Sequence, residues 1–254
     1  MNFHTFGSEE NKVIILIHGM LTPWQMWEEA ISCFSANYYI VVPELDAHTQ
    51  KEPSTFKTVE EEARLIKEYM LENHNGKVYM ICGLSMGGRI AAILAGIKEI
   101  STDYLVLDGA PLKKISSVLI NVMKKNYISI IKKSRRRDPK LIRNFKIKFL
   151  PERYLEPYLK IADNMKKQSV INISDSVFSE FECPVYSERM KILFMHGTKA
   201  NELISGQSAL KMKEVNPQTE IRRYDGYAHA QLLCLEAKKW VKEVIDFMEA
   251  HNDI

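Results

Sequence analysis

Apolar residues along this chain occur in short unbroken runs that are separated by segments with helical periodicity. Many of the apolar residues in the runs are β-branched, and several runs end at a glycine or a proline. Unbroken runs of this length are typical of central strands that are covered on both faces. The predicted strands cover residues 12–18, 38–45, 77–84, 103–109, 191–197 and 219–226, with a weaker candidate at 2–7.

The segments between these runs carry helix signals. Thr58 precedes a helical pattern and Glu61 follows three residues later, as a capping box requires. A strand–helix–strand repeat predicts a mostly parallel central sheet with helices on both faces, an α/β fold. The predicted helices cover residues 24–34, 58–73, 205–215 and 230–249, and another starts at Ser85.

Residues 112–187 interrupt this alternation. The segment is longer than a simple crossover and mostly helical in pattern, with Pro139, Pro151 and Pro157 as breakers. We interpret it as a helical cap inserted into a core made of residues 1–111 and 188–254.

The cap segment is strongly basic, although the chain as a whole has a formal net charge of only +3. Residues 113–167 contain 17 Lys and Arg against four acids, a net of +13, which leaves 18 basic and 28 acidic residues elsewhere. A solvated helical surface explains part of this charge. The excess also suggests an anionic partner: an acidic substrate, a weak association with anionic lipid headgroups, or another protein surface. Nucleic acid is not expected, because no binding motif is present and the remaining chain is acidic.

The remaining composition is that of an ordinary globular protein. The N-terminal residues lack a secretory signal pattern, and no apolar run is long enough to span a bilayer. The cysteines stand singly, without the spacing of a zinc site, and are expected to be buried free thiols: Cys33, Cys82, Cys183 and Cys234. These features predict a cytoplasmic protein.

The segment Gly83-Leu84-Ser85-Met86-Gly87-Gly88 matches G-x-S-x-G between a predicted strand and a predicted helix. A serine at such a turn is held in strained backbone geometry with its hydroxyl exposed. Glycines are needed two residues to either side because the strand folds back against the helix. Ser85 is therefore the candidate nucleophile; a plain glycine-rich turn that binds phosphate is the alternative.

A serine hydroxyl needs a hydrogen-bonded base near neutral pH, most often histidine. His229 follows the last predicted strand, where an imidazole can reach the carboxyl edge of the sheet, whereas His18 and His196 precede glycines at strand ends and are expected to be structural or to line the pocket. The amides of Met20 and Met86 are candidates for a two-donor oxyanion hole.

The order of these motifs resembles the α/β-hydrolase superfamily: HG at 18–19, GLSMGG at 83–88, LDGAP at 107–111, an inserted cap, HGTK at 196–199 and GYAH at 226–229. The similarity is greatest to small carboxylesterases and monoacylglycerol-lipase-like enzymes. It implies a sheet of eight or slightly fewer strands, a Ser–acid–His triad and no cofactor; no metal is expected either.

The acid of that triad departs from the family pattern. The family usually places a carboxylate three residues after the glycine of the HGTK-type motif, which is Gly197 here, and this chain has Ala200 at that position. Glu202 is the favoured substitute, Asp108 at the end of another predicted strand is the second candidate, and Asp225 is a third. A missing acid would favour a non-catalytic, ligand-binding protein.

These residues predict hydrolysis of a carboxylic ester or a thioester through an acyl-enzyme on Ser85. A lyase or a carbon–carbon bond hydrolase on the same scaffold is the other enzymatic alternative. Residues near the HG turn are expected to contact the substrate: Gly19, Leu21 and Trp24.

Overall fold

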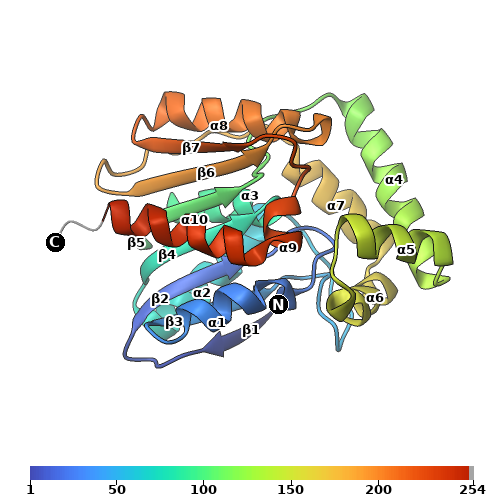
Figure 1. The fold of residues 1–254 in the computed structure, drawn as a ribbon, viewed down its shortest axis with the longest axis horizontal. Coiled ribbons are helices and arrows are strands. Elements are labelled where there is room, and N and C mark those ends of the chain that lie inside the picture. The colour runs from blue at the N-terminus through green and yellow to red at the C-terminus, as the bar shows by residue number, and fades with distance from the viewer. Residues whose placement is uncertain (252–254) are drawn as a thin grey trace.

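A computed structural model describes residues 1–251 and contains one seven-stranded sheet with the strand order β1-β3-β2-β4-β5-β6-β7 (Figure 1). All neighbouring strands pair in parallel except β1, which pairs antiparallel with β3. The strands are β1 Asn2–Phe6, β2 Lys12–Ile17, β3 Tyr38–Glu44, β4 Lys77–Leu84, β5 Ser101–Asp108, β6 Lys191–Gly197 and β7 Thr219–Tyr224. The predicted mostly parallel sheet is confirmed, including its N-terminal strand.

The apolar runs form strands because both of their faces are buried. In β2, Ile15 and Ile17 face one apolar cluster, whereas Ile14 and Leu16 face another on the opposite side of the sheet. Alternating side chains of a strand point to opposite faces, so a doubly covered strand is apolar at every position.

Helices cover both faces of the sheet. The first cluster contains residues of α2 (Val59–His74), α3 (Met86–Ala95) and α8 (Leu203–Val215), and the second contains residues of α1 (Glu28–Phe34), α9 (Gln231–Leu235) and α10 (Ala237–Ala250). The Thr58 hydroxyl accepts a hydrogen bond from the Glu61 amide at 3.1 Å, as the capping pattern predicts.

Two of the predicted helices are interrupted. The 24–34 segment begins as a 3-10 turn, η1 (Trp24–Trp27), before α1 starts. The C-terminal helix is divided into α9 and α10, because Glu236 leaves the helical conformation with φ −130° and ψ 45°. The helical spacing of apolar residues continues across Glu236, so the sequence alone does not predict the division.

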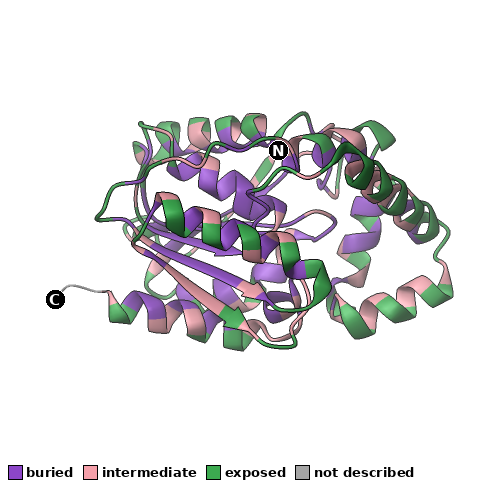
Figure 2. Cartoon of the chain, turned by 90° about the horizontal axis from the view of Figure 1, so that it is seen from above, coloured by how far each residue is buried: buried purple, intermediate pink, exposed green. Residues whose placement is uncertain are grey.

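The chain between β5 and β6 forms helices beside the carboxyl ends of the strands (Figure 1). We call α4, α5, α6 and α7 the cap helices: Ser117–Arg135, Pro139–Lys148, Leu155–Asn164 and Lys167–Val177, with the 3-10 turn η2 Glu152–Tyr154 before α6. The outer side of α4 is largely exposed (Figure 2). Buried Arg89 of α3 joins the end of α7 to the sheet layer, since its guanidinium donates to the carbonyls of Val177 and Glu180, both at 2.9 Å.

All four cysteines are free thiols, but only Cys82 and Cys234 are buried. Cys183 is partly buried and Cys33 is exposed on α1, so the expectation that all four are buried is wrong. Cys33 lies on the exposed side of α1, within the segment 24–34 that the sequence predicts to be helical. None of the helices formed by residues 1–251 is long and apolar enough to cross a membrane.

Candidate active site

Ser85 occupies the sharp turn between β4 and α3 with φ 53° and ψ −117°. A positive φ in a residue with a side chain is strained and persists only where surrounding contacts hold it. Here the Ser85 amide donates to the carbonyl of Asp108 at 2.7 Å. The flanking glycines are required, because a Cβ on Gly83 would lie 2.3 Å from the carbonyl oxygen of Gly87, and one on Gly87 would lie 2.2 Å from that of Ile17.

His229 lies within hydrogen-bond distance of this hydroxyl. Its Nε2 is 2.8 Å from Ser85 Oγ, and its Nδ1 is 3.1 Å from Glu202 Oε1. A carboxylate only accepts hydrogen bonds, so Nδ1 carries the proton and Nε2 accepts from the serine hydroxyl. Ser85, His229 and Glu202 thus form one continuous hydrogen-bonded chain.

Glu202 reaches the imidazole from η3 (Ala200–Glu202), a 3-10 turn after β6. Ala200 is exposed, whereas Glu202 is only 2% exposed. Burial opposes ionisation of Glu202, but the hydrogen bond and the charge of His229 outweigh it and lower the pKa of this carboxyl. Burial likewise disfavours protonated His229, but the contact with Glu202 outweighs this and raises the pKa of the imidazole.

Asp108 does not take this position. It is buried at the end of β5 and makes no hydrogen bond to His229 in the described part of the chain. Burial, reinforced by the nearby charge of Glu202, raises the pKa of Asp108 to about 7. Asp225 is exposed, lies 3.4 Å from Arg223 and makes no hydrogen bond to His229 among the described residues. The structure therefore brings Glu202, and neither aspartate, to His229.

The two residues expected to supply oxyanion donors flank the serine. Met86 is the first residue of α3, where helix amides have no partner within the helix. Met20 lines the pocket in front of Ser85. A Cβ on Gly19 would lie 3.3 Å from the carbonyl oxygen of Leu84 and 3.4 Å from the Cβ of Ser85, so this loop packs directly against the serine turn.

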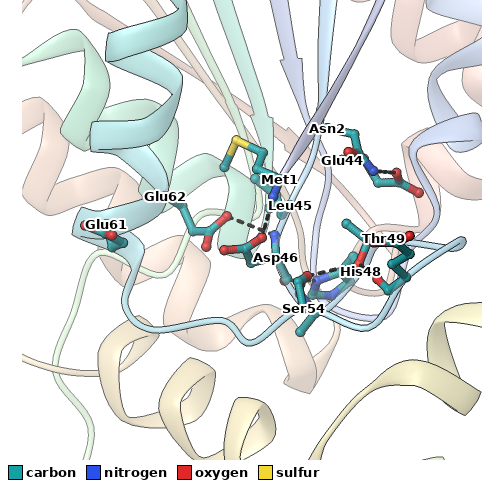
Figure 3. Close-up of polar contacts among 12 residues, drawn as sticks. Met1, Asn2, Glu44, Leu45, Asp46, His48, Thr49, Ser54, Glu61 and Glu62 are labelled. Carbon is teal, nitrogen blue, oxygen red and sulfur yellow. Dashed lines mark hydrogen bonds and ion pairs between the residues drawn. The ribbon is translucent and has the colours of Figure 1, made fainter.

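A pair of histidines holds this loop. His48 was not predicted, since nothing in the pattern around it distinguishes it from a surface loop residue; it is fully buried and its Nε2 accepts the Leu21 amide at 3.0 Å. The Nδ1 of His48 contacts the carbonyl of Asp46 at 3.1 Å (Figure 3). His18 is also fully buried, with Nε2 accepting the Leu45 amide at 3.2 Å, in the structural role expected of it.

Both rings act as neutral acceptors. Burial lowers the pKa of His18 to about 4 and that of His48 to about 3. The rings lie 5.0 Å apart, and protonation of either would place a charge in this buried space and remove an acceptor. The His48 contact holds Leu21 at φ 58°, next to Met20.

A pocket of about 330 Å³ opens in front of Ser85 and His229. Its walls are mainly apolar and come from the loop after β2, from the serine and histidine turns, and from the cap helices α4 and α5. The lining residues are Gly19, Met20, Leu21, Thr22, Leu84, Ser85, Tyr127, Ile130, Leu141, Asn144, Phe145, Lys148, Phe149, His229 and Ala230.

Gly19 and Leu21 line this pocket, as expected, but Trp24 does not. Trp24 stacks on His4 with ring centroids 4.1 Å apart, beside the antiparallel strand β1. The expectation that Trp24 contacts the substrate is therefore wrong, because the 3-10 turn that begins at Trp24 directs the indole toward β1.

Comparisons with known proteins agree with this architecture. Residues 12–126 match the family model described as alpha/beta hydrolase fold. A putative alpha/beta hydrolase family protein from Desulfitobacterium hafniense is 20% identical with a TM-score of 0.73, covering 97% of this chain and 100% of that one. An esterase from Thermogutta terrifontis is 16% identical with a TM-score of 0.71, covering 98% and 93%.

A third solved structure, of carboxylesterases from Nitrososphaera gargenis, is 14% identical with a TM-score of 0.73 and covers 98% of this chain and 94% of that one. No match to the chain is found among curated proteins. The chain has the α/β-hydrolase fold, and the resemblance to α/β-hydrolases that its motifs indicate is confirmed.

Proposed function

We propose that this protein is a serine hydrolase that cleaves carboxylic esters or thioesters. The observation that carries the proposal is the hydrogen-bonded chain of Ser85, His229 and Glu202, with 2.8 Å between Ser85 Oγ and His229 Nε2. These three hydrogen-bonded side chains meet the geometric requirement for a nucleophile, a general base and a group that orients the base.

In the first half of the reaction, Ser85 Oγ forms a bond to the carbonyl carbon while its proton moves to His229 Nε2. Glu202 stabilises the resulting imidazolium, and the amides of Met20 and Met86 donate to the oxyanion. When the tetrahedral intermediate collapses, the bond to the alcohol or thiol breaks, and the leaving group takes the proton from His229.

In the second half, water attacks the acyl-enzyme. His229 removes a proton from the water, the carboxylic acid is released, and the proton returns to Ser85 Oγ. The mainly apolar pocket suits an acyl chain or another hydrophobic group, and its volume of about 330 Å³ lies at the small end of ligand sites.

The contact between Glu202 and His229 argues against a non-catalytic ligand-binding protein. Ala200 alone suggests that the orienting acid has been lost, but a buried carboxylate occupies its place. The esterases among the structural neighbours favour ester hydrolysis over lyase or carbon–carbon bond chemistry.

The test is labelling with a fluorophosphonate probe together with turnover of a short-chain p-nitrophenyl ester. The wild-type protein should react with both, and Ser85→Ala should react with neither, because the attacking oxygen is gone. Exposed Ser101 at the start of β5 supplies the matched control, Ser101→Ala, which should behave as the wild type. Absence of labelling in the wild type would contradict the proposal, and a panel with carbon–carbon bond substrates would identify the alternative chemistry.

A further inference from the structure

One helix of the cap introduces a cation at the mouth of the otherwise apolar pocket. Helix α5 contributes Leu141, Asn144, Phe145 and Lys148 to the pocket wall, at the spacing of one helical face. Asn144 and Lys148 are exposed, unlike half-buried Leu141 and Phe145, so they lie at the rim. The rim is thus polar and positively charged, while the wall behind it is apolar.

Lys148 has no anionic partner in the described part of the chain, in contrast to three other cap cations. Lys146 pairs with Glu152, Arg137 with Asp163 at 2.7 Å, and Lys124 with Asp175 at 2.5 Å. Asn144 likewise has no hydrogen-bond partner within residues 1–251. An ammonium and an amide, four residues apart on one helix, therefore remain free to bind a ligand.

The charge of the cap favours an anion at this rim. Lys140 and Arg143 of the same helix also lack carboxylate partners among the described residues, and residues 113–167 carry a net charge of +13. A cleft edged by charges of one sign attracts ligands of the opposite sign. Lys148 is the pocket-lining member of this set, so it is the residue that acts on a bound molecule.

We propose that Lys148 and Asn144 form an anion subsite, so that the preferred ester carries a carboxylate or phosphate group remote from the scissile carbonyl. The subsite rests on the proposed esterase function of Ser85 and defines its substrate class. The apolar part of the substrate, between the scissile carbonyl and the anionic group, lies against Leu141 and Phe145. The Lys148 ammonium pairs with the anion, and the Asn144 amide donates a hydrogen bond to it.

The test compares two soluble p-nitrophenyl esters of equal chain length: a hemiester of a straight-chain dicarboxylic acid, and the neutral fatty-acid ester. The measured quantity is the ratio of kcat/KM for the anionic ester to that for the neutral one. Lys148→Met should lower this ratio about fivefold, the magnitude of a solvent-exposed ion pair. The wild-type ratio should also fall as salt is added.

Lys146→Met is the matched control, since it removes the same charge from the same helix at a residue that does not line the pocket. An equal ratio in the two variants would overturn the subsite. A Lys148 effect confined to esters presented in anionic vesicles, and absent from the soluble pair, would also overturn it, because the charge would then act on a surface. Failure of the wild type to hydrolyse either ester would instead count against the esterase proposal itself.

Discussion

Gly109 offers a sharp test of the triad geometry, because it packs against two members of the triad without belonging to it. It follows Asp108 with φ +63°, and a Cβ built on it would lie 2.9 Å from His229 Cε1, 3.1 Å from His229 Nδ1 and 3.4 Å from Glu202 Oε1. Gly109→Ala therefore introduces one methyl group directly against the imidazole.

The expected loss of activity can be worked from these distances. Ordinary contact begins at 3.4 Å, so the ring must move by about 0.5 Å to accept the methyl group. A misplacement of ~1 Å costs roughly 100-fold in rate, so half of that displacement should lower kcat about tenfold. The left-handed backbone of an alanine should also reduce the free energy of unfolding by about 1–2 kcal/mol.

Gly226→Ala separates the two effects. Gly226 has φ +79° and nothing within 4 Å of its added Cβ, so this variant has the backbone cost without the collision. Turnover of a p-nitrophenyl ester and urea unfolding should show similar destabilisation in both variants, but a loss of kcat only in Gly109→Ala. A Gly109→Ala enzyme with wild-type kcat, or an equal loss in both variants, would refute the triad geometry.

Substitutions at three further residues test the triad acid and two buried groups outside the triad. Glu202→Gln should lower kcat by several orders of magnitude, up to ~10⁴-fold, and move the acidic limb of the pH–rate profile to lower pH, because the contact with Glu202 is what raises the pKa of His229; an unshifted limb would exclude this role. His48→Ala should reduce the free energy of unfolding by about 1–3 kcal/mol and lower kcat more than it raises KM, since the buried Leu21 amide loses its acceptor. Partial recovery in His48→Gln, whose side-chain oxygen can accept that amide, would separate this role from cavity formation. Burial raises the pKa of Glu62 to about 8, so its ionisation destabilises the fold as pH rises from the ordinary value of 4.5 through 8. Glu62→Gln should therefore be more stable than the wild type in urea at pH 8, with a smaller gain at pH 5, and an equal gain at both would contradict the shift.

The sheet could be predicted because each central strand is apolar on both faces, and runs such as that of β2 are too short and too rich in β-branched residues for a buried helix. The nucleophile turn could be predicted for a related reason, since Gly83 and Gly87 mark positions where any side chain collides with backbone. His48 could not, because its role depends on the Leu21 amide, 27 residues away in the chain. Trp24 was misassigned because proximity in sequence to Gly19 does not fix the direction of the indole.

The position of the Glu202 carboxylate depends on the 3-10 turn η3 after β6. Glu202 could be predicted from the sequence as the candidate acid, but the turn could not. The acid lies two residues after the usual family position, at 202 instead of 200. Two residues span about 6.6 Å in a strand but only about 4 Å in a 3-10 helix, and a glutamate extends one methylene further than an aspartate, so the carboxylate of Glu202 can still reach the imidazole. Glu202 is buried against His229, whereas Ala200 at the start of the same turn is exposed. Moving the carboxylate back, with Ala200→Asp and Glu202→Ala combined, should therefore leave kcat as low as Glu202→Ala alone, because the new carboxylate faces solvent. Recovery of ester turnover in the double variant would show that the loop can unwind, and that the turn does not determine which residue serves as the acid.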